Sequence, residues 1–174
     1  MNKKQIHLLE FLEQSGSRLH RMLVRLTLDE EAAEELMQEV FLRLFKITHF
    51  ERIENPEAYA ARIAINLAFD RRRQHRWFSE IPQNRPDWRI PQVDRRLIQA
   101  EAVEKILDAA ETLSGLTREC FVLRYVEQME HEQIAKRTRK NTKQVRALCS
   151  KAIQRIRRIL NEQNASFYKE AINE

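Results

Sequence analysis

The sequence contains little glycine: of its 174 residues, two are Gly, four are Pro and two are Cys. Hairpin-rich sheets and barrels need Gly, Asn or Pro at most of their turns, so this scarcity argues against an all-β fold. It also leaves no Gly-rich loop that could hold the phosphates of a nucleotide. No run approaches the ~20 apolar residues of a membrane-spanning helix, and the N-terminal stretch lacks the features of a signal peptide. We therefore expect a cytoplasmic protein without direct membrane insertion.

Residues that could carry chemistry are also sparse. Cys120 and Cys149 lie far apart and form no redox or metal-binding motif, so we expect two reduced thiols in the core. The five histidines show no metal-ligand spacing, and the sequence offers neither a catalytic dyad nor a cofactor loop. The sequence thus predicts no metal, no cofactor and no enzymatic activity.

What the sequence does contain favours helices. Hydrophobic residues make up 43% and charged residues 33%, with Leu, Glu, Arg, Gln and Ala abundant, which is typical of a globular helical protein. Lys and Arg number 31 against 26 Asp and Glu, for a net charge of +5. This modest excess conceals an acidic block over 29–39 and a segment without acidic residues over 133–161. We predict an all-α fold.

Three prolines divide the chain. Pro82, Pro86 and Pro91 lie close together between Trp77 and Val93. Prolines at this density prevent a continuous helix and favour extended backbone. We therefore predict two helical domains, at residues 1–78 and 100–163, joined by a flexible Pro-rich linker at 79–99 and followed by a tail at 164–174.

The first domain carries helical signals and a basic end. Apolar residues recur every three or four positions over 36–45, with Asp29 as a candidate N-cap. A second helix is predicted to begin at Asn55-Pro56, as N-cap and first helical residue, and to run to Arg76. It ends with four arginines within six residues, more than stabilisation of the helix dipole requires.

The second domain ends in a basic amphipathic helix. From Thr142 onward, an apolar stripe between Val145 and Leu160 lies opposite a face of basic and small polar residues. A short helical pattern at 130–138 and a turn at 139–141 precede it, which is the order of a helix-turn-helix. Such a helix fits the major groove of DNA, where acidic side chains would be repelled. A solvated basic face, or a helix that binds an acidic protein, is the alternative.

Four stretches, in this order, resemble bacterial RNA polymerase sigma factors of the extracytoplasmic-function (ECF) group. Residues 29–43, DEEAAEELMQEVFLR, resemble the family stretch D..DAEDLVQEVFLR, and residues 55–71, NPEAYAARIAINLAFDR, resemble NP.AWLYRIARNLALDR. In the second domain, LSGLTRECFVLRY at 113–125 resembles LPPRQREVFLLRY. Ile134-Ala135, the turn and Val145-Arg146 then follow at the expected spacing.

The resemblance implies a function. The protein would bind core RNA polymerase, recognise −35 and −10 promoter elements and promote DNA melting, with no chemistry of its own. The two domains would be sigma regions 2 and 4, which engage the β′ coiled coil and the β flap of the polymerase. An anti-sigma factor, membrane-anchored or not, is a further implied partner. The Asn55-Pro56 loop and the short chain are reminiscent of the iron-starvation branch of the group.

The resemblance also assigns roles to residues. For the core polymerase interface it implies Glu35, Gln38, Glu39 and Arg43. For the −10 element, captured as melted single strand, it implies Arg62, Asn66, Arg71, Arg72, Arg73 and Arg76. For the −35 element, read by the helix from Thr142, it implies Lys143, Arg146, Ala147, Ser150 and Lys151, with Arg137, Arg139 and Lys140 on phosphates. Tyr59 is as compatible with a place in the helical core as with a role at the −10 element.

The sequence departs from the family at the turn and at the start of the motif, among other positions. The turn at 139–141 lacks the Gly that the family usually has there, so we expect Asn141 to supply left-handed or capping geometry. Glu130 begins the motif where relatives often have Ser or Thr.

Two other functions also fit the pattern. One is a stand-alone helix-turn-helix regulator that binds duplex DNA without polymerase. The other is a helical adaptor or anti-sigma-like protein without a DNA role.

Overall fold

The structure is a computed structural model that describes residues 3–79 and 95–172, and every regular element within these two ranges is helical. The prediction of an all-α fold is confirmed. The elements are α1 Lys3–Thr27, α2 Glu30–Lys46, the 3₁₀ turn η1 Phe50–Arg52, α3 Pro56–Ser79, α4 Arg95–Glu111, α5 Gly115–Phe121, the π-helical segment η2 Val122–Val126, α6 His131–Thr138 and α7 Thr142–Ile172. All three prolines of the predicted linker lie outside the described residues.

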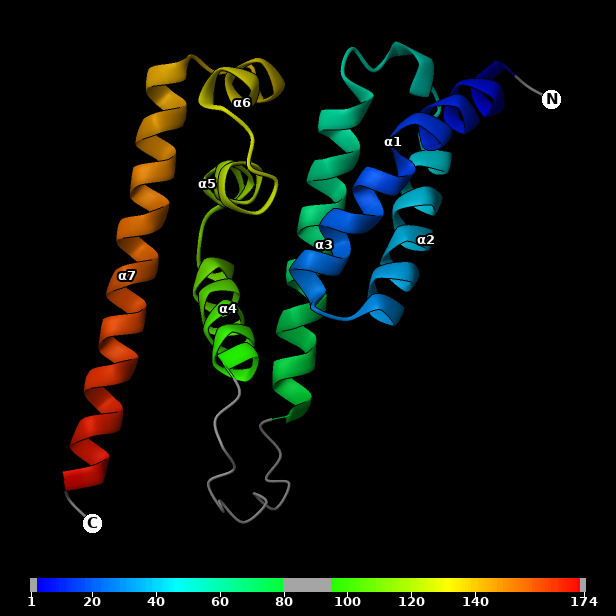
Figure 1. Cartoon of the computed structure of the whole chain (residues 1–174). Helices are drawn as coiled ribbons and strands as arrows, with labels where there is room; N and C mark the ends of the chain where they lie inside the picture. Colours follow the sequence, from blue (N-terminus) through cyan, green and yellow to red (C-terminus); the bar gives the residue numbers. More distant parts are fainter. Residues whose placement is uncertain (1–2, 80–94, 173–174) are drawn as a thin grey trace.

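Helices α1, α2 and α3 form the first domain, in which α1 packs against both of the others (Figure 1). Its core is made of aliphatic side chains such as Leu23, Val40 and Ile65, each at most 1% exposed. Burying one such side chain contributes about 1.5–3 kcal/mol. Phe11 and Phe50 meet edge to face, with ring centroids 5.7 Å apart, and so fix the turn before α3 against α1.

Side-chain caps define where two of these helices begin. The Asp29 carboxylate accepts a hydrogen bond from the Ala32 backbone N–H over 3.2 Å, which confirms it as the N-cap of α2. The Asn55 side-chain oxygen accepts from the Ala58 N–H over 2.9 Å, and α3 starts at Pro56. Pro56 is tolerated there because its missing N–H would have no partner in the helix.

Helices α4 to α7 form the second domain, with α7 running along its outer side (Figure 1). The predicted apolar stripe of α7 faces inward: Val145, Cys149, Ala152 and Ile156 are buried. Helix α6 precedes α7 across a turn of three residues, as a helix-turn-helix requires. This geometry confirms the motif that the sequence indicated.

The turn between α6 and α7 achieves its shape without glycine. Arg139, at the C-cap of α6, has φ 55° and ψ 40°, the left-handed conformation that glycine usually supplies. Asn141 instead caps α7: its side-chain oxygen accepts from the Gln144 N–H over 2.8 Å. The expected capping role of Asn141 is correct, and the left-handed residue is Arg139.

The two domains pack against each other, an arrangement that the sequence left open. Helices α1 and α3 meet α4, α5, η2 and the end of α6 along a contact that we call the seam (Figure 1). One cluster of buried apolar side chains extends through both domains, from Leu26 and Phe69 to Leu107 and Phe121. The guanidinium carbon of Arg118 lies 4.9 Å from the centroid of the Phe69 ring.

Candidate nucleic-acid interface

The first turns of α7 present one continuous polar and basic face. Its members follow i, i+3, i+4, i+7 spacing and are exposed, while the opposite side of the helix is buried. The residues on this face are Lys143, Arg146, Ala147, Ser150 and Lys151. Ala147 and Ser150 are small, so a duplex could approach the helix closely between the longer basic side chains. An α-helix with an exposed face of this kind fits the major groove of DNA.

Three cations flank this helix on the α6 side. Lys140 is exposed in the turn, and Arg139 is exposed but forms an ion pair with Glu54 of the first domain. Arg137 is half-buried, and its guanidinium donates to the Glu57 backbone oxygen over 3.0 Å. Burial, together with the nearby Arg18, lowers the pKa of Arg137 from its usual value.

A second basic face lies on α3 and points toward the second domain. Arg62, Asn66 and Arg73 recur at helical spacing and are exposed, and Tyr59 on the same stripe is 42% exposed rather than part of the core. The Arg62 Nε donates to the Glu119 Oε2 atom over 2.9 Å, and the Arg73 Nε donates to Glu111 over 3.2 Å. Both arginines therefore reach across the seam.

The remaining arginines of this set differ in their surroundings. Arg71 forms an ion pair with Glu35 over 2.9 Å, so that a predicted DNA residue and a predicted polymerase residue contact each other. The Arg72 side chain is 9% exposed and donates to Asp108 over 2.7 Å. Arg76 lies in α3, near its C-terminal end. The side chain of Arg72 is thus far less exposed than those of Arg62, Arg71 and Arg73.

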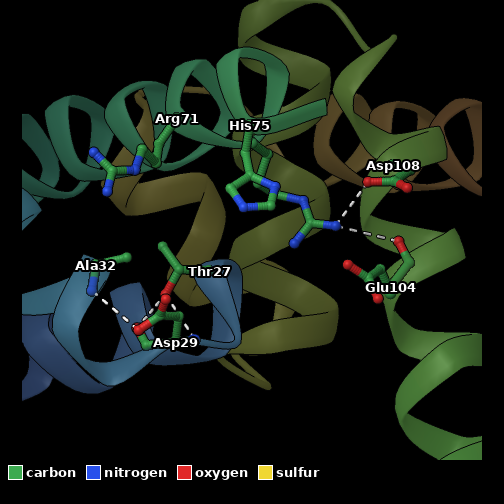
Figure 2. Close-up of a pocket in the computed structure, with 8 residues that line it drawn as sticks. Thr27, Asp29, Ala32, Arg71, His75, Glu104 and Asp108 are labelled. Carbon is green, nitrogen blue, oxygen red and sulfur yellow. Dashed lines mark hydrogen bonds and ion pairs between the residues drawn. The ribbon is translucent and has the colours of Figure 1, made fainter. Parts of the chain in front are cut away.

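A polar cavity of about 260 Å³ opens beside Arg72 between the two domains (Figure 2). Its walls come from the α1–α2 turn, α3 and α4. Figure 2 shows Arg71 and His75 on α3 and, across the cavity, Glu104 and Asp108 on α4. Both signs of charge line it, and among the described residues no cluster of His, Cys, Asp and Glu is able to hold a metal ion. The cavity leaves part of the seam open to solvent.

An apolar groove lies between α1 and α2, on the elements that carry the predicted polymerase residues. It is lined by Leu12, Gly16, Met37, Gln38, Phe41 and Leu42. Gln38 and Arg43 are exposed around it, and Arg43 pairs with Glu39 over 2.9 Å. Leu42 and Phe45 remain 47% and 42% exposed. An apolar centre with a polar rim is the composition of a specific protein interface.

Sequence reasoning missed the apolar part of this groove and the carboxylates of the seam. Leu42 lies two positions from the buried Val40 and Leu44 and so on the opposite side of α2, outside the apolar periodicity that marked the core. Glu119 is 2% exposed, and its role depends on a contact with Arg62 that lies 57 residues away in sequence. No pattern within one helix could reveal that contact.

Both thiols lie in the core of the second domain, as expected. Cys120 and Cys149 are free and buried, and the Cys149 sulfur lies 3.8 Å from the Cys120 carbonyl oxygen. Burial, followed by the nearby Cys149 and Glu119, raises the pKa of the Cys120 thiol from 9.0 to about 12. Burial also raises the pKa of Cys149. These thiols help to fix α5 against α7.

Both domains of the chain match models of known protein families. Residues 11–78 match the family model of sigma-70 region 2, and residues 103–156 match that of sigma-70 region 4. Together the matches cover 122 residues, in the order region 2 then region 4. The chain belongs to the sigma-70 family of sigma factors. Sigma factors bind core RNA polymerase and promoter DNA, and they initiate transcription without being enzymes themselves.

Curated proteins and solved structures assign no function to this chain. A search of curated proteins gave no match. Among solved structures, the chain is similar to the sigma factor RpoE from Bartonella quintana, crystallised in complex with the anti-sigma factor NepR. The two share 18% sequence identity over 87% of this chain and 95% of that one, with a TM-score of 0.48. Membership in the family rests on the two family models.

Within the described ranges, no helix combines the length and apolar character needed to cross a membrane.

Proposed function

We propose that this protein is a sigma factor of the ECF group, acting in the cytoplasm. The matches to regions 2 and 4 are separated by residues 79–102, a stretch of 24 residues. Folded domains below about 40 residues usually need disulfides, metals or partners, so this stretch is too short for a further independent domain between them. A sigma factor with regions 2 and 4 directly joined is the arrangement of the ECF group. The iron-starvation branch is a finer proposal, which the Asn55-Pro56 loop supports.

We propose that three surfaces of the protein bind three different partners: the polymerase, the −10 strand and the −35 element. The groove between α1 and α2, together with Glu35, Gln38, Glu39 and Arg43 of α2, binds the β′ coiled coil of the polymerase. The α3 face, with Arg62, Asn66, Arg71, Arg72, Arg73 and Arg76, holds the melted −10 strand. The α7 face of Lys143, Arg146, Ala147, Ser150 and Lys151 reads the −35 element, while Arg137, Arg139 and Lys140 bind phosphates. Region 2 comprises 1–78, the linker 79–99, region 4 100–163 and the tail 164–174.

The separation of the two basic faces is the observation that carries this proposal. One lies on α3 and the other on α7, so each belongs to a different domain. A simple helix-turn-helix regulator needs only the second face, together with a dimer to match its half-sites. Two faces on two linked domains, beside an apolar groove, suit a protein that spans two promoter elements while bound to another protein.

The test is binding to promoter DNA with and without core polymerase. We expect the free protein to shift a promoter fragment poorly in a gel, the holoenzyme to shift it well, and run-off transcription to depend on the protein. Tight binding of duplex DNA by the free protein, without any effect on polymerase, would favour the stand-alone regulator. An absence of both activities would favour the adaptor.

An anti-sigma factor is the proposed antagonist, anchored in the membrane or not. The exposed apolar groove supports this proposal, because a protein that covered it would block the polymerase. Pull-down of partners with the wild-type chain, compared with a variant whose groove carries a charge, tests it: the antagonist should bind only the wild type.

A further inference from the structure

Two arginines from different domains meet at the sulfur of Met129. The Arg18 Nη2 of α1 donates to the Met129 Sδ atom over 3.6 Å, and the Arg137 Nη1 of α6 donates to the same atom over 3.8 Å. A thioether sulfur is a weak hydrogen-bond acceptor, whereas a guanidinium is a charged donor that pairs best with oxygen. Two strong donors therefore share an acceptor that binds neither of them strongly.

The backbone of Met129 holds this sulfur in place. Met129 lies between η2 and α6, and its N–H donates to the Leu123 carbonyl oxygen over 2.9 Å. Its own carbonyl oxygen accepts from the Arg124 Nη1 over 2.9 Å. Both polar backbone groups of Met129 are thus bonded to the second domain, so the loop itself sets the position of the thioether beside the two arginines.

The two arginines are held in turn by oxygens around them. The Arg18 Nε lies 3.7 Å from the Oε2 atom of Glu127, a side chain that is 8% exposed. The Arg137 Nη2 donates to the Glu57 carbonyl oxygen over 3.0 Å, while its Nε is buried without a hydrogen-bond partner among the described residues. A buried donor without a partner is unfavourable. The Arg137 guanidinium therefore retains hydrogen-bonding capacity that the present contacts do not use.

Oxidation would turn the Met129 sulfur into a strong acceptor. Methionine sulfoxide carries a polar S=O oxygen, which disrupts an apolar core because it finds no donor there. At Met129 the donors are already in place. Arg18 is 42% exposed, so its side chain can shift outward to admit the added oxygen. The sulfoxide would gain charge-assisted hydrogen bonds that the thioether lacks.

Met129 is accessible to a small oxidant. It is half-buried and contacts the partly exposed Arg18, whereas Met22 is a core residue with 2% exposure. Met37 is half-buried as well, but it lines the apolar groove between α1 and α2, and within the described ranges no arginine donates to its sulfur. Met129 and Met37 therefore differ chiefly in the donors around their sulfur atoms.

Hydrogen peroxide is a sufficient oxidant for this step. A lone pair of the Met129 sulfur attacks one peroxide oxygen, so that an S–O bond forms and the O–O bond breaks. The proton on the transferred oxygen passes to the departing hydroxide, which leaves as water. Sulfur loses two electrons and the peroxide gains two. The positive charges of Arg18 and Arg137 stabilise the hydroxide as it departs.

We propose that Met129 is a site of reversible oxidation by peroxide, and that its sulfoxide oxygen binds Arg18 and Arg137 and strengthens the contact between α1 and α6. The oxidised chain is then the more stable form, which reverses the usual effect of methionine oxidation. Methionine sulfoxide reductases restore the thioether. The inference rests on these contacts and not on the proposed function.

The test compares two full-length variants that each keep one of the two half-buried methionines. Met37→Leu keeps Met129, and Met129→Leu keeps Met37. Each protein is treated with hydrogen peroxide in its native state, and peptide mass spectrometry locates the added oxygen. Thermal unfolding followed by circular dichroism is measured before treatment, after treatment and after repair by methionine sulfoxide reductases. Met1 and Met22 are present in both variants, so they cannot cause a difference between them.

We expect peroxide to oxidise Met129 in the Met37→Leu variant and to raise its Tm by about 2–4 °C. A shift of this size corresponds to one additional hydrogen bond to a charged group in a chain of this length. Treatment with the reductases should return the Tm to its starting value. In the Met129→Leu variant, oxidation should leave the Tm unchanged or lower it, because the sulfur of Met37 has no guanidinium donor.

Variants of the arginines test whether these donors cause the shift. In the Met37→Leu background, Arg18→Gln should abolish most of the rise on oxidation. Arg21→Gln is the control, because Arg21 is exposed on the same helix, and this variant should keep the rise. If Arg18→Gln does not fold, a comparison without oxidant carries the test: Met129→Gln should melt above Met129→Leu, since the Gln side chain also presents an acceptor oxygen to the arginines.

The proposal is overturned if the Tm falls or stays the same when Met129 is oxidised, or if the rise persists in Arg18→Gln. It is also overturned if Met129 stays reduced in peroxide that oxidises Met37 of the wild-type protein. None of these measurements uses polymerase or DNA. A negative result here leaves the sigma function standing, and a failure of run-off transcription leaves the oxidation site standing.

Discussion

Arg62 on α3 donates from its Nε to the Oε2 atom of Glu119 on α5 over 2.9 Å. This contact joins the face proposed for the melted −10 strand to a carboxylate buried in the other domain. Helix α3 of region 2 and helix α5 of region 4 are therefore held together by the same guanidinium that is proposed to hold DNA. In this protein, the contact between the two domains and the proposed recognition of promoter DNA use the same side chain.

The groove between α1 and α2 is expected to bind core polymerase through its apolar centre. Leu42→Asp places a charge at its edge, and we expect the affinity for core polymerase to fall about tenfold or more, ~1.4 kcal/mol, because a buried apolar anchor becomes a desolvated charge. Leu28→Asp is the control, since Leu28 is 46% exposed, against 47% for Leu42, but lies outside the groove. Biolayer interferometry against immobilised core polymerase checks both. Equal losses in the two variants would contradict the assignment of the groove.

The exposed face of α7 is expected to read the −35 element. Arg146→Ala and Lys151→Ala should each weaken promoter binding by the holoenzyme by about 1–3 kcal/mol, because each removes a base or phosphate contact. Arg157→Ala, further along the same helix, is expected to cost less, since it contributes only general electrostatic attraction. Filter binding on promoters with intact and scrambled −35 elements separates these effects. The assignment of this face would be contradicted if Arg146→Ala and Lys151→Ala weakened binding equally on the intact and the scrambled promoters. The same holds if the loss were no larger than that of Arg157→Ala.

The left-handed backbone at Arg139 is expected to cost stability. Arg139→Gly and Arg139→Ala both remove the side chain and its contact with Glu54, but only glycine adopts φ 55° without strain. We therefore expect the glycine variant to be more stable than the alanine variant by about 0.5–1 kcal/mol, because the left-handed strain of alanine, about 1–2 kcal/mol, exceeds the extra backbone entropy that glycine loses on folding, about 0.5–1 kcal/mol. Urea unfolding followed by circular dichroism measures the difference. If the alanine variant were as stable as the glycine variant, or more stable, the turn would not be held in this conformation.

The buried thiols are expected to be unreactive and to make the second domain sensitive to alkaline pH. Because burial raises the pKa of Cys120 from 9.0 to about 12, the unfolded chain loses this proton first as pH rises. The stability linked to Cys120 is thus fully present below pH 9 and is lost as the pH rises toward 12.

Thiol titration with an aromatic disulfide at pH 8 checks this expectation. The native wild-type protein should react slowly and the protein in concentrated guanidinium rapidly, while Ser17→Cys, in an exposed position on α1, should add one fast thiol to the native protein. Rapid reaction of two thiols in the native wild type would show that α5 and α7 do not bury them.

Local signals predicted most of the helices. Asp29 and Asn55 cap α2 and α3 as expected, because a capping side chain bonds to backbone within three residues and the sequence contains both partners. The apolar stripe of α7 was equally predictable, since the 3.6-residue periodicity lies within one helix. The left-handed conformation of Arg139 was not predictable, because it depends on the geometry of the whole turn.

The relation between the domains could not be predicted. Arg62, Arg72 and Arg73 look the same in sequence whether they face solvent, DNA or a carboxylate of α4 or α5. Their partners are decided by how two amphipathic bundles meet, and that depends on many weak contacts far apart in the chain. The position of these arginines on α3 was predictable, whereas their engagement in the packed form was not.

The central claim is that this protein gives core RNA polymerase the ability to start at a promoter. The most direct measurement is single-round run-off transcription with core polymerase, purified full-length protein and a library of promoter fragments. The account predicts transcripts that begin at defined positions and require the protein, together with a stable complex of the protein and core polymerase. No complex with core polymerase at micromolar concentration, and no transcript above that of core enzyme alone, would contradict it.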